Sequence, residues 1–196
     1  MTDSVRSFVA VPLPEKIQAD IFAAAQELSR RLPQLGVKWA GKVENLHITV
    51  KFLGQIEEEK LTALAEDLAR TVAPLPRFRL ELRGMGAFPS PRKANVVWAG
   101  VEDGARGLTA IAEAVEGVGE RFGFGREQRA FTGHVTVGRC EKRNGVDARV
   151  ALEPWADRAL GTVAVDEVHV YESRLATMAG QGSTYVLRSR AALGAN

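Results

Sequence analysis

Apolar and polar positions follow two different periods along the chain, which predicts a mixture of strands and helices. The run SFVAV at residues 7–11 is apolar and rich in β-branched and aromatic residues, as short buried strands are. Between Glu15 and Leu32, apolar residues recur at steps of three and four, which predicts an amphipathic helix that Pro33 ends. The chain then passes through a loop into the apolar run LHITVKFLG, so the order is strand, helix, loop, strand.

The same order recurs from the middle of the chain. NVVWAGV at residues 95–101 predicts a second buried strand, residues 105–122 carry an apolar face at helical spacing, and a loop leads to FTGHVTVGR. The spacing agrees as well, because His47 lies 39 positions after Phe8 and His134 lies 38 positions after Val96. This repeat of a whole supersecondary unit predicts two similar lobes.

The remaining segments complete each half. Residues 57–71 predict a second helix, and residues 77–86 alternate apolar and charged side chains as a strand does. Residues 146–160 predict a short helix around a loop, and residues 163–173 and 183–190 predict closing strands. No linker separates independent domains, so we expect one α+β domain over residues 1–196. Its two lobes, about residues 1–90 and 91–196, would enclose a cleft, and terminal segments can cross between them.

Composition narrows the class of protein. The 45% hydrophobic and 26% charged residues fit a globular domain, and a net charge of +2 argues against a histone-like nucleic-acid binder while leaving room for a local basic cleft. The single Cys140 excludes an internal disulfide and a cysteine-based zinc site. No apolar run is as long as a membrane span, and no signal-peptide pattern is present. We therefore expect a cytoplasmic monomer without a membrane or an obligate protein partner.

Two of the three histidines lie in nearly identical words, HITV at residues 47–50 and HVTV at residues 134–137. Side chains two apart on a strand share a face, so His47 projects with Thr49, and His134 with Thr136. A pseudo-twofold arrangement of the lobes would bring these two pairs to face each other across the cleft.

Two facing imidazoles suit acid/base chemistry, because one accepts a proton while the other donates one near neutral pH. Around a phosphodiester, one histidine activates the nucleophile and the other protonates the departing oxygen, while the threonine hydroxyls bind the non-bridging oxygens. Arg139, five residues after His134, is the nearest candidate cation for the phosphate. Which histidine is the base stays open.

Two alternatives compete with this interpretation. A single histidine in an apolar strand is usually a hydrogen-bonded structural residue, which the duplication argues against for the pair, whereas His169 has no threonine partner and fits that description or a surface position. A metal site is disfavoured because no carboxylate or further histidine stands at ligand spacing from either motif, and threonine is a poor ligand for transition metals. We therefore expect neither a metal nor another cofactor.

The motifs and their surroundings, RSFVAVPLP, ENLHITVKFLG, LRGMGAFPSPRKANVVWAGV, FTGHVTVGR and VHVYESRL, resemble the two-histidine (2H) phosphoesterase superfamily. Within it the chain is most similar to the RNA 2′,3′-cyclic phosphodiesterases, formerly called 2′-5′ RNA ligases. The resemblance implies a bilobal, pseudo-twofold α+β fold of duplicated β-α-β units, with antiparallel-type sheets lining a central cleft.

The resemblance also implies an activity. A 2′,3′-cyclic phosphate at an RNA end, or in a small cyclic nucleotide, is opened to a 2′-phosphate without metal or nucleotide cofactor. His47 and His134 would be the acid/base pair, Thr49 and Thr136 would hold the phosphate, and Arg139 matches the family's arginine. The alternatives are 2′-5′ ligation of RNA as the physiological role and a non-catalytic RNA- or nucleotide-binding module.

Residues beside the motifs are candidates for further substrate contacts. Unbroken strand alternation puts Lys51 on the face of His47 and Thr49, where it either binds the RNA backbone or is a solvated lysine at a strand end. The same alternation puts Phe52 on the opposite face, in the core. Three further residues near the motifs suit either base stacking or ordinary packing: Trp39, Phe131 and Arg129.

Overall fold

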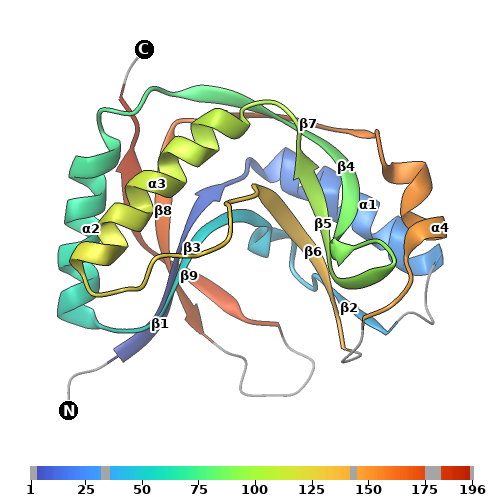
Figure 1. Ribbon diagram of the computed structural model, residues 1–196, viewed down its shortest axis with the longest axis horizontal. Helices are drawn as coiled ribbons and strands as arrows, with labels where there is room; N and C mark the ends of the chain where they lie inside the picture. Colours follow the sequence, from blue (N-terminus) through green and yellow to red (C-terminus); the bar gives the residue numbers. More distant parts are fainter. Residues whose placement is uncertain (1–3, 32–35, 142–144, 175–181, 195–196) are drawn as a thin grey trace.

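A single antiparallel sheet forms the centre of the molecule. The computed structural model describes residues 4–31, 36–141, 145–174 and 182–194. Within them, a nine-stranded sheet has the order β7-β4-β5-β6-β3-β1-β8-β9, and β2 pairs with β6. The pairings between these strands are antiparallel, and the sheet curls between its two ends (Figure 1). The predicted α+β fold with antiparallel sheets is thereby confirmed.

The elements follow the periodicity of the sequence closely. The strands are β1 (Ser4–Pro12), β2 (Val37–Trp39), β3 (His47–Glu57), β4 (Phe78–Ser90), β5 (Lys93–Val101), β6 (His134–Cys140), β7 (Ala159–Val165), β8 (Glu167–Arg174) and β9 (Thr184–Ala192). The helices are α1 (Glu15–Arg31), α2 (Glu58–Val72), α3 (Ala105–Arg121) and α4 (Arg149–Leu152), with 3-10 turns η2 (Val43–Asn45) and η3 (Glu153–Trp155). Pro33, expected to end the first helix, lies outside the described residues.

One expected element differs from the structure. The single closing strand predicted at residues 163–173 is divided at Asp166 into β7 and β8. The division follows from topology, because β7 pairs with β4 at one end of the sheet while β8 pairs with β1 in the other half. Local periodicity carries no information about which neighbour each part will pair with.

Helices cover one face of the curled sheet and leave the other for the site. α2 and α3 pack side by side over the half that contains β1, β3 and β9, whereas α1 packs against β6 and β7 (Figure 1). Ile21 and Leu28 of α1 are fully buried, as its apolar face predicted. No helix in the described part of the chain is long and apolar enough to span a bilayer.

The halves of the chain are not the halves of the sheet. β4 ends at Ser90 yet pairs with β5 and β7, while β8 pairs with β1 and β9 lies outside β8. The two halves of the sheet meet where β3 pairs with β6, at Ile48 opposite Val135, and both side chains are 0% exposed. This joint brings the two His-x-Thr-x strands together.

Candidate active site

The joint between β3 and β6 sets the two motifs against each other. With Ile48 opposite Val135 in an antiparallel pair, the register places His47 across from Thr136 and Thr49 across from His134. The charge of His134 also contributes to lowering the pKa of His47, as expected for two neighbouring imidazoles. The structure therefore brings the four motif side chains together, as the duplicated sequence predicted.

Backbone carbonyls fix the tautomer of both histidines. Nδ1 of His47 lies 2.7 Å from the carbonyl oxygen of Asn45, and Nδ1 of His134 lies 2.8 Å from that of Thr132. Because a carbonyl only accepts, Nδ1 carries the proton in each neutral ring, and Nε2 keeps its lone pair. In His47 that lone pair accepts the hydroxyl of Thr49 at 3.0 Å. Both rings are therefore held the same way, with Nε2 available for proton transfer.

Burial lowers the pKa of both imidazoles. For His47 the value falls to about 4, chiefly through burial, with Arg139 and His134 adding to the effect. Burial also lowers the pKa of His134, and the charge of Arg139 acts in the same direction. Both rings are therefore neutral in the free protein at pH 7, ready to accept a proton.

Aromatic rings pack against both imidazoles. Phe8 stacks on His47 with centroids 4.8 Å apart, and Tyr185 meets the same ring edge-on at 5.3 Å. Phe88 meets His134 edge-on at 5.0 Å. These contacts restrict both imidazoles in orientation as well as shielding them from water.

A β-bulge follows each motif at the same place. In the pairing of β1 with β3, Ala10 lies opposite Thr49 and Val9 opposite Lys51, which leaves Val50 as the extra residue. In the pairing of β5 with β6, partners step directly from Thr136 to Gly138, which leaves Val137 as the extra residue. The last valine of each His-x-Thr-x motif is thus a bulge, and strand alternation reverses after it.

The reversal turns the fifth residue after each histidine back toward the site. These residues are Arg139 after His134 and Phe52 after His47. Arg139 is exposed, forms no ion pair with a described residue and lowers the pKa of both histidines. Phe52 is 61% exposed, and its ring centroid lies 6.0 Å from that of Phe8. The site therefore carries a guanidinium at one of two equivalent positions and an exposed aromatic ring at the other.

The same bulge overturns two expectations for β3. Lys51 does not project with His47, since it is 7% exposed, its Nζ lies 2.7 Å from Oε2 of Glu116 on α3, and it donates to the carbonyl of Gly125. Phe52 is not a core residue. Both predictions were wrong because they assumed unbroken alternation. Comparing the two motifs by position would have paired Phe52 with Arg139.

Two tyrosines near His47 were not identified from the sequence. Tyr171 on β8 stacks on Phe8 with centroids 5.4 Å apart, and Tyr185 on β9 contacts the ring of His47. Burial raises the pKa of both hydroxyls, so they stay protonated at pH 7. β8 and β9 come from the end of the chain, so only the sheet topology reveals their proximity to the first motif.

The other candidate side chains are packing, loop or structural residues. Trp39 packs against the core from β2, while Phe131 is half-buried and Arg129 is exposed in the loop before β6. His169 is buried, with Nδ1 2.8 Å from the Tyr171 hydroxyl and Nε2 2.6 Å from Glu167, which fits a structural histidine. Among the described residues, no group of three or more His, Cys, Asp and Glu side chains is placed to hold a metal ion.

Known proteins are similar to this chain in sequence and in fold. The model of the LigT like phosphoesterase family matches residues 11–98. An RNA 2′,3′-cyclic phosphodiesterase from Archaeoglobus fulgidus is 36% identical over 172 residues, which cover 87% of this chain and 92% of that protein. One from Aeropyrum pernix is 39% identical over 133 residues, covering 67% of this chain and 74% of that protein.

Structural comparison agrees with these sequence matches. The crystal structure of E. coli LigT complexed with 3′-AMP is similar with a TM-score of 0.74 at 28% identity, covering 97% of this chain and 99% of that chain. The relatives match over most of their own length, and the fold agrees across nearly the whole molecule. The chain belongs to the LigT-like phosphoesterase family, within the two-histidine phosphoesterases.

Proposed function

We propose that the protein is a metal-independent RNA 2′,3′-cyclic phosphodiesterase that leaves a 2′-phosphate. One observation carries the proposal: each histidine lies across from the threonine of the other motif, and both have Nδ1 bound by a carbonyl. Such a site has two Nε2 atoms for proton transfer and two hydroxyls for the phosphate. Relatives with the name RNA 2′,3′-cyclic phosphodiesterase support the choice of substrate.

The reaction requires one neutral and one protonated imidazole. A water oxygen attacks phosphorus while the bond from phosphorus to O3′ breaks. One histidine takes the proton of the water at Nε2, and the other gives its Nε2 proton to O3′. The bound phosphate anion favours protonation of one ring, which offsets the lowering caused by burial and Arg139. Sequence and geometry leave the two roles exchangeable between His47 and His134.

Three groups stabilise the charge that builds up on the non-bridging oxygens. Thr136 supplies one hydroxyl donor, and Thr49 supplies another once its hydroxyl turns from Nε2 of His47 to the phosphate. Arg139 supplies a cation that no described residue neutralises. Prearranged donors of this kind act without reorganisation during the reaction. Phe52, at the equivalent position on β3, is placed to stack on the base of the terminal nucleotide.

The test is a product-resolved assay on an RNA oligonucleotide with a 2′,3′-cyclic phosphate end, in excess EDTA. We expect a 2′-phosphate product, and each of His47→Ala and His134→Ala should lose about 10²- to 10⁴-fold in rate. Arg106→Gln is the control, because it removes an exposed side chain from α3, on the helical face, and should retain turnover.

Several outcomes would contradict the proposal. Loss of turnover in EDTA would exclude a metal-independent reaction, and a 3′-phosphate product would exclude the stated regiochemistry. Full activity of both alanine variants would remove the histidines from the mechanism. RNA binding without turnover would identify a non-catalytic module, and joined RNA ends without hydrolysis would identify a ligase.

A further inference from the structure

Arg6 lies on the face of β1 that carries Phe8, and its side chain has no partner among the described residues. The two side chains share this face because they are two residues apart in the strand. Arg6 is exposed and forms no hydrogen bond or ion pair with a described residue through its side chain. In the register of β1 with β3 it lies opposite Gln55, while Phe8 lies opposite Phe52.

Arg6 lies within electrostatic range of the site. Burial raises the pKa of the Tyr185 hydroxyl, and the charges of Arg139 and Arg6 both act against that rise. The ring of Tyr185 contacts the ring of His47 at 5.3 Å. The charges of Arg139 and Arg6 therefore both act on the hydroxyl of Tyr185, whose ring packs against His47.

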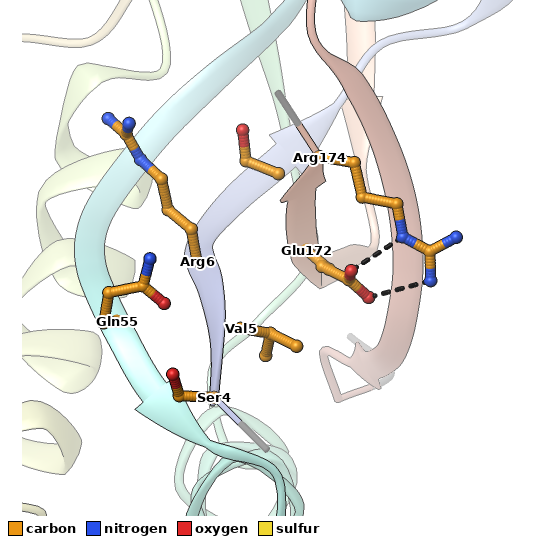
Figure 2. Close-up of a pocket in the computed structure, with 7 residues that line it drawn as sticks. Ser4, Val5, Arg6, Gln55, Glu172 and Arg174 are labelled. Atoms are coloured by element: carbon orange, nitrogen blue, oxygen red, sulfur yellow. Dashed lines mark hydrogen bonds and ion pairs between the residues drawn. The ribbon is translucent and has the colours of Figure 1, made fainter. Parts of the chain in front are cut away.

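A cavity of about 310 Å³ adjoins Arg6 at this end of the sheet, and Figure 2 shows its lining. Its only carboxylate among the described residues, that of Glu172, lies 2.7 Å from Arg174 and 2.8 Å from Arg188. Arg6 extends instead across β3, on the side of Gln55 (Figure 2). The positive charge of Arg6 is thus left for a ligand, and the neutral polar residues Gln55, Ser4 and Ser173 line the same cavity.

The order of groups along the two strands matches the order of groups in a nucleotide chain. From the motif outward, β3 presents Thr49, then Phe52, then Gln55 beside Arg6 of β1. Arg6 is four residues from Ala10, the partner of Thr49, or about 13 Å along an extended strand. A phosphate donor, an aromatic ring and a cation therefore follow one another at spacings suited to a phosphate, a base and a further phosphate.

We propose that Arg6 and Gln55 form a subsite for a backbone phosphate on the 5′ side of the terminal nucleotide. The occupant is single-stranded RNA, since the subsite pairs a free guanidinium with a neighbouring exposed aromatic ring. The protein then prefers RNA ends over cyclic mononucleotides. This inference rests on the proposed function, because it extends the same site.

The experiment measures KM and kcat over a series of substrates. The series contains a nucleoside 2′,3′-cyclic phosphate, the same compound with a 5′-phosphate, and di- and trinucleotides that end in the cyclic phosphate. For the wild type, KM should fall when 5′ phosphates are added. Arg6→Gln should raise KM for the longer substrates about 5- to 10-fold, while leaving kcat and the nucleoside substrate unchanged. Arg6→Glu should raise KM further.

Salt dependence gives a second readout that a purely structural role would not change. Losing one phosphate contact to single-stranded RNA should reduce the slope of log(kcat/KM) against log salt by about 0.7. The matched control is Arg106→Gln, which removes an exposed arginine from α3, on the helical face, that pairs with no residue in the described part of the chain. It should leave both the KM series and the slope unchanged.

The possible outcomes distinguish failure of the Arg6 subsite from failure of the proposed function. If the wild type opens cyclic phosphates but KM does not depend on length, or if Arg6→Gln retains the wild-type series, the subsite is wrong and the function stands. If the wild type opens no 2′,3′-cyclic phosphate, the proposed function itself fails. Unchanged turnover of the nucleoside substrate by Arg6→Gln shows that the variant is folded, and a parallel loss on that substrate would overturn a 5′ subsite.

Discussion

At the scale of single residues, Arg139 has two effects that can be separated by pH. Its charge lowers the pKa of His47 and of His134, because a nearby cation disfavours the imidazolium form. Arg139→Met should therefore raise both pKa values. The base must be neutral to act, so the acid limb of kcat/KM should move to higher pH, and kcat/KM at the optimum should fall about 10²-fold. The measurement is a pH profile with a cyclic nucleotide.

Arg106→Met provides the control for this shift, since it removes a similar charge from the outer face of α3. Its acid limb should coincide with that of the wild type. An unshifted acid limb in Arg139→Met would show that the guanidinium does not govern the protonation of the histidines.

Phe52 is the second residue whose role depends on the side to which it points. Phe52→Ala should raise KM for a nucleoside 2′,3′-cyclic phosphate about 5- to 30-fold, because stacking of a base on an aromatic ring is lost. Turnover of glycerol 1,2-cyclic phosphate, which has no base, should not change. Val150→Ala removes a hydrophobic side chain that is 86% exposed on α4, and it should change neither. Equal losses on both substrates would refute base stacking.

At the scale of elements, the ion pair between Lys51 and Glu116 links β3 to α3. Their side chains are 6% and 12% exposed, so Lys51→Ala leaves a nearly buried carboxylate unpaired and should cost about 3 kcal/mol in the free energy of unfolding. The double variant Lys51→Met/Glu116→Leu should recover most of that loss. Denaturant unfolding measures both values.

The activity of the same variants tests the direction in which Lys51 points. The double variant should keep KM for RNA, because Lys51 packs under α3 rather than in the site. A higher KM for RNA with unchanged KM for a cyclic nucleoside would restore Lys51 as a substrate contact.

At the scale of the whole molecule, the joint of Ile48 with Val135 determines whether the two motifs meet. Ile48→Ala removes a fully buried side chain and should cost about 2–5 kcal/mol in stability. It should also lower kcat below the unfolding temperature, since loosening the joint moves His47 relative to Thr136. Leu80→Ala in β4 removes an equally buried side chain away from the joint and should cost similar stability with kcat retained. Equal kcat values in the two folded variants would contradict this role of the joint.

Much of the fold was predictable from local pattern, because burial on one face imposes a period that the sequence must carry. Ile21 and Leu28 of α1 are buried as predicted, and β5 appears where NVVWAGV stands. The separation of β7 from β8 at Asp166 was not predictable, since pairing partners distant in sequence decide it. Tyr171 and Tyr185 were missed for the same reason.

By itself, the sequence determined the order of elements, their duplication and the four motif side chains, because helix and strand periods and the His-x-Thr-x spacing are local properties of the chain. Only the tertiary structure decided which side chains flank the site. A bulge at Val50 and another at Val137 arise from pairing with β1 and β5, and each reverses the faces of the strand beyond it. Lys51 therefore faces α3 while Phe52 and Arg139 face the site, because the pairing of two strands, and not the sequence of either one, fixes where a bulge forms.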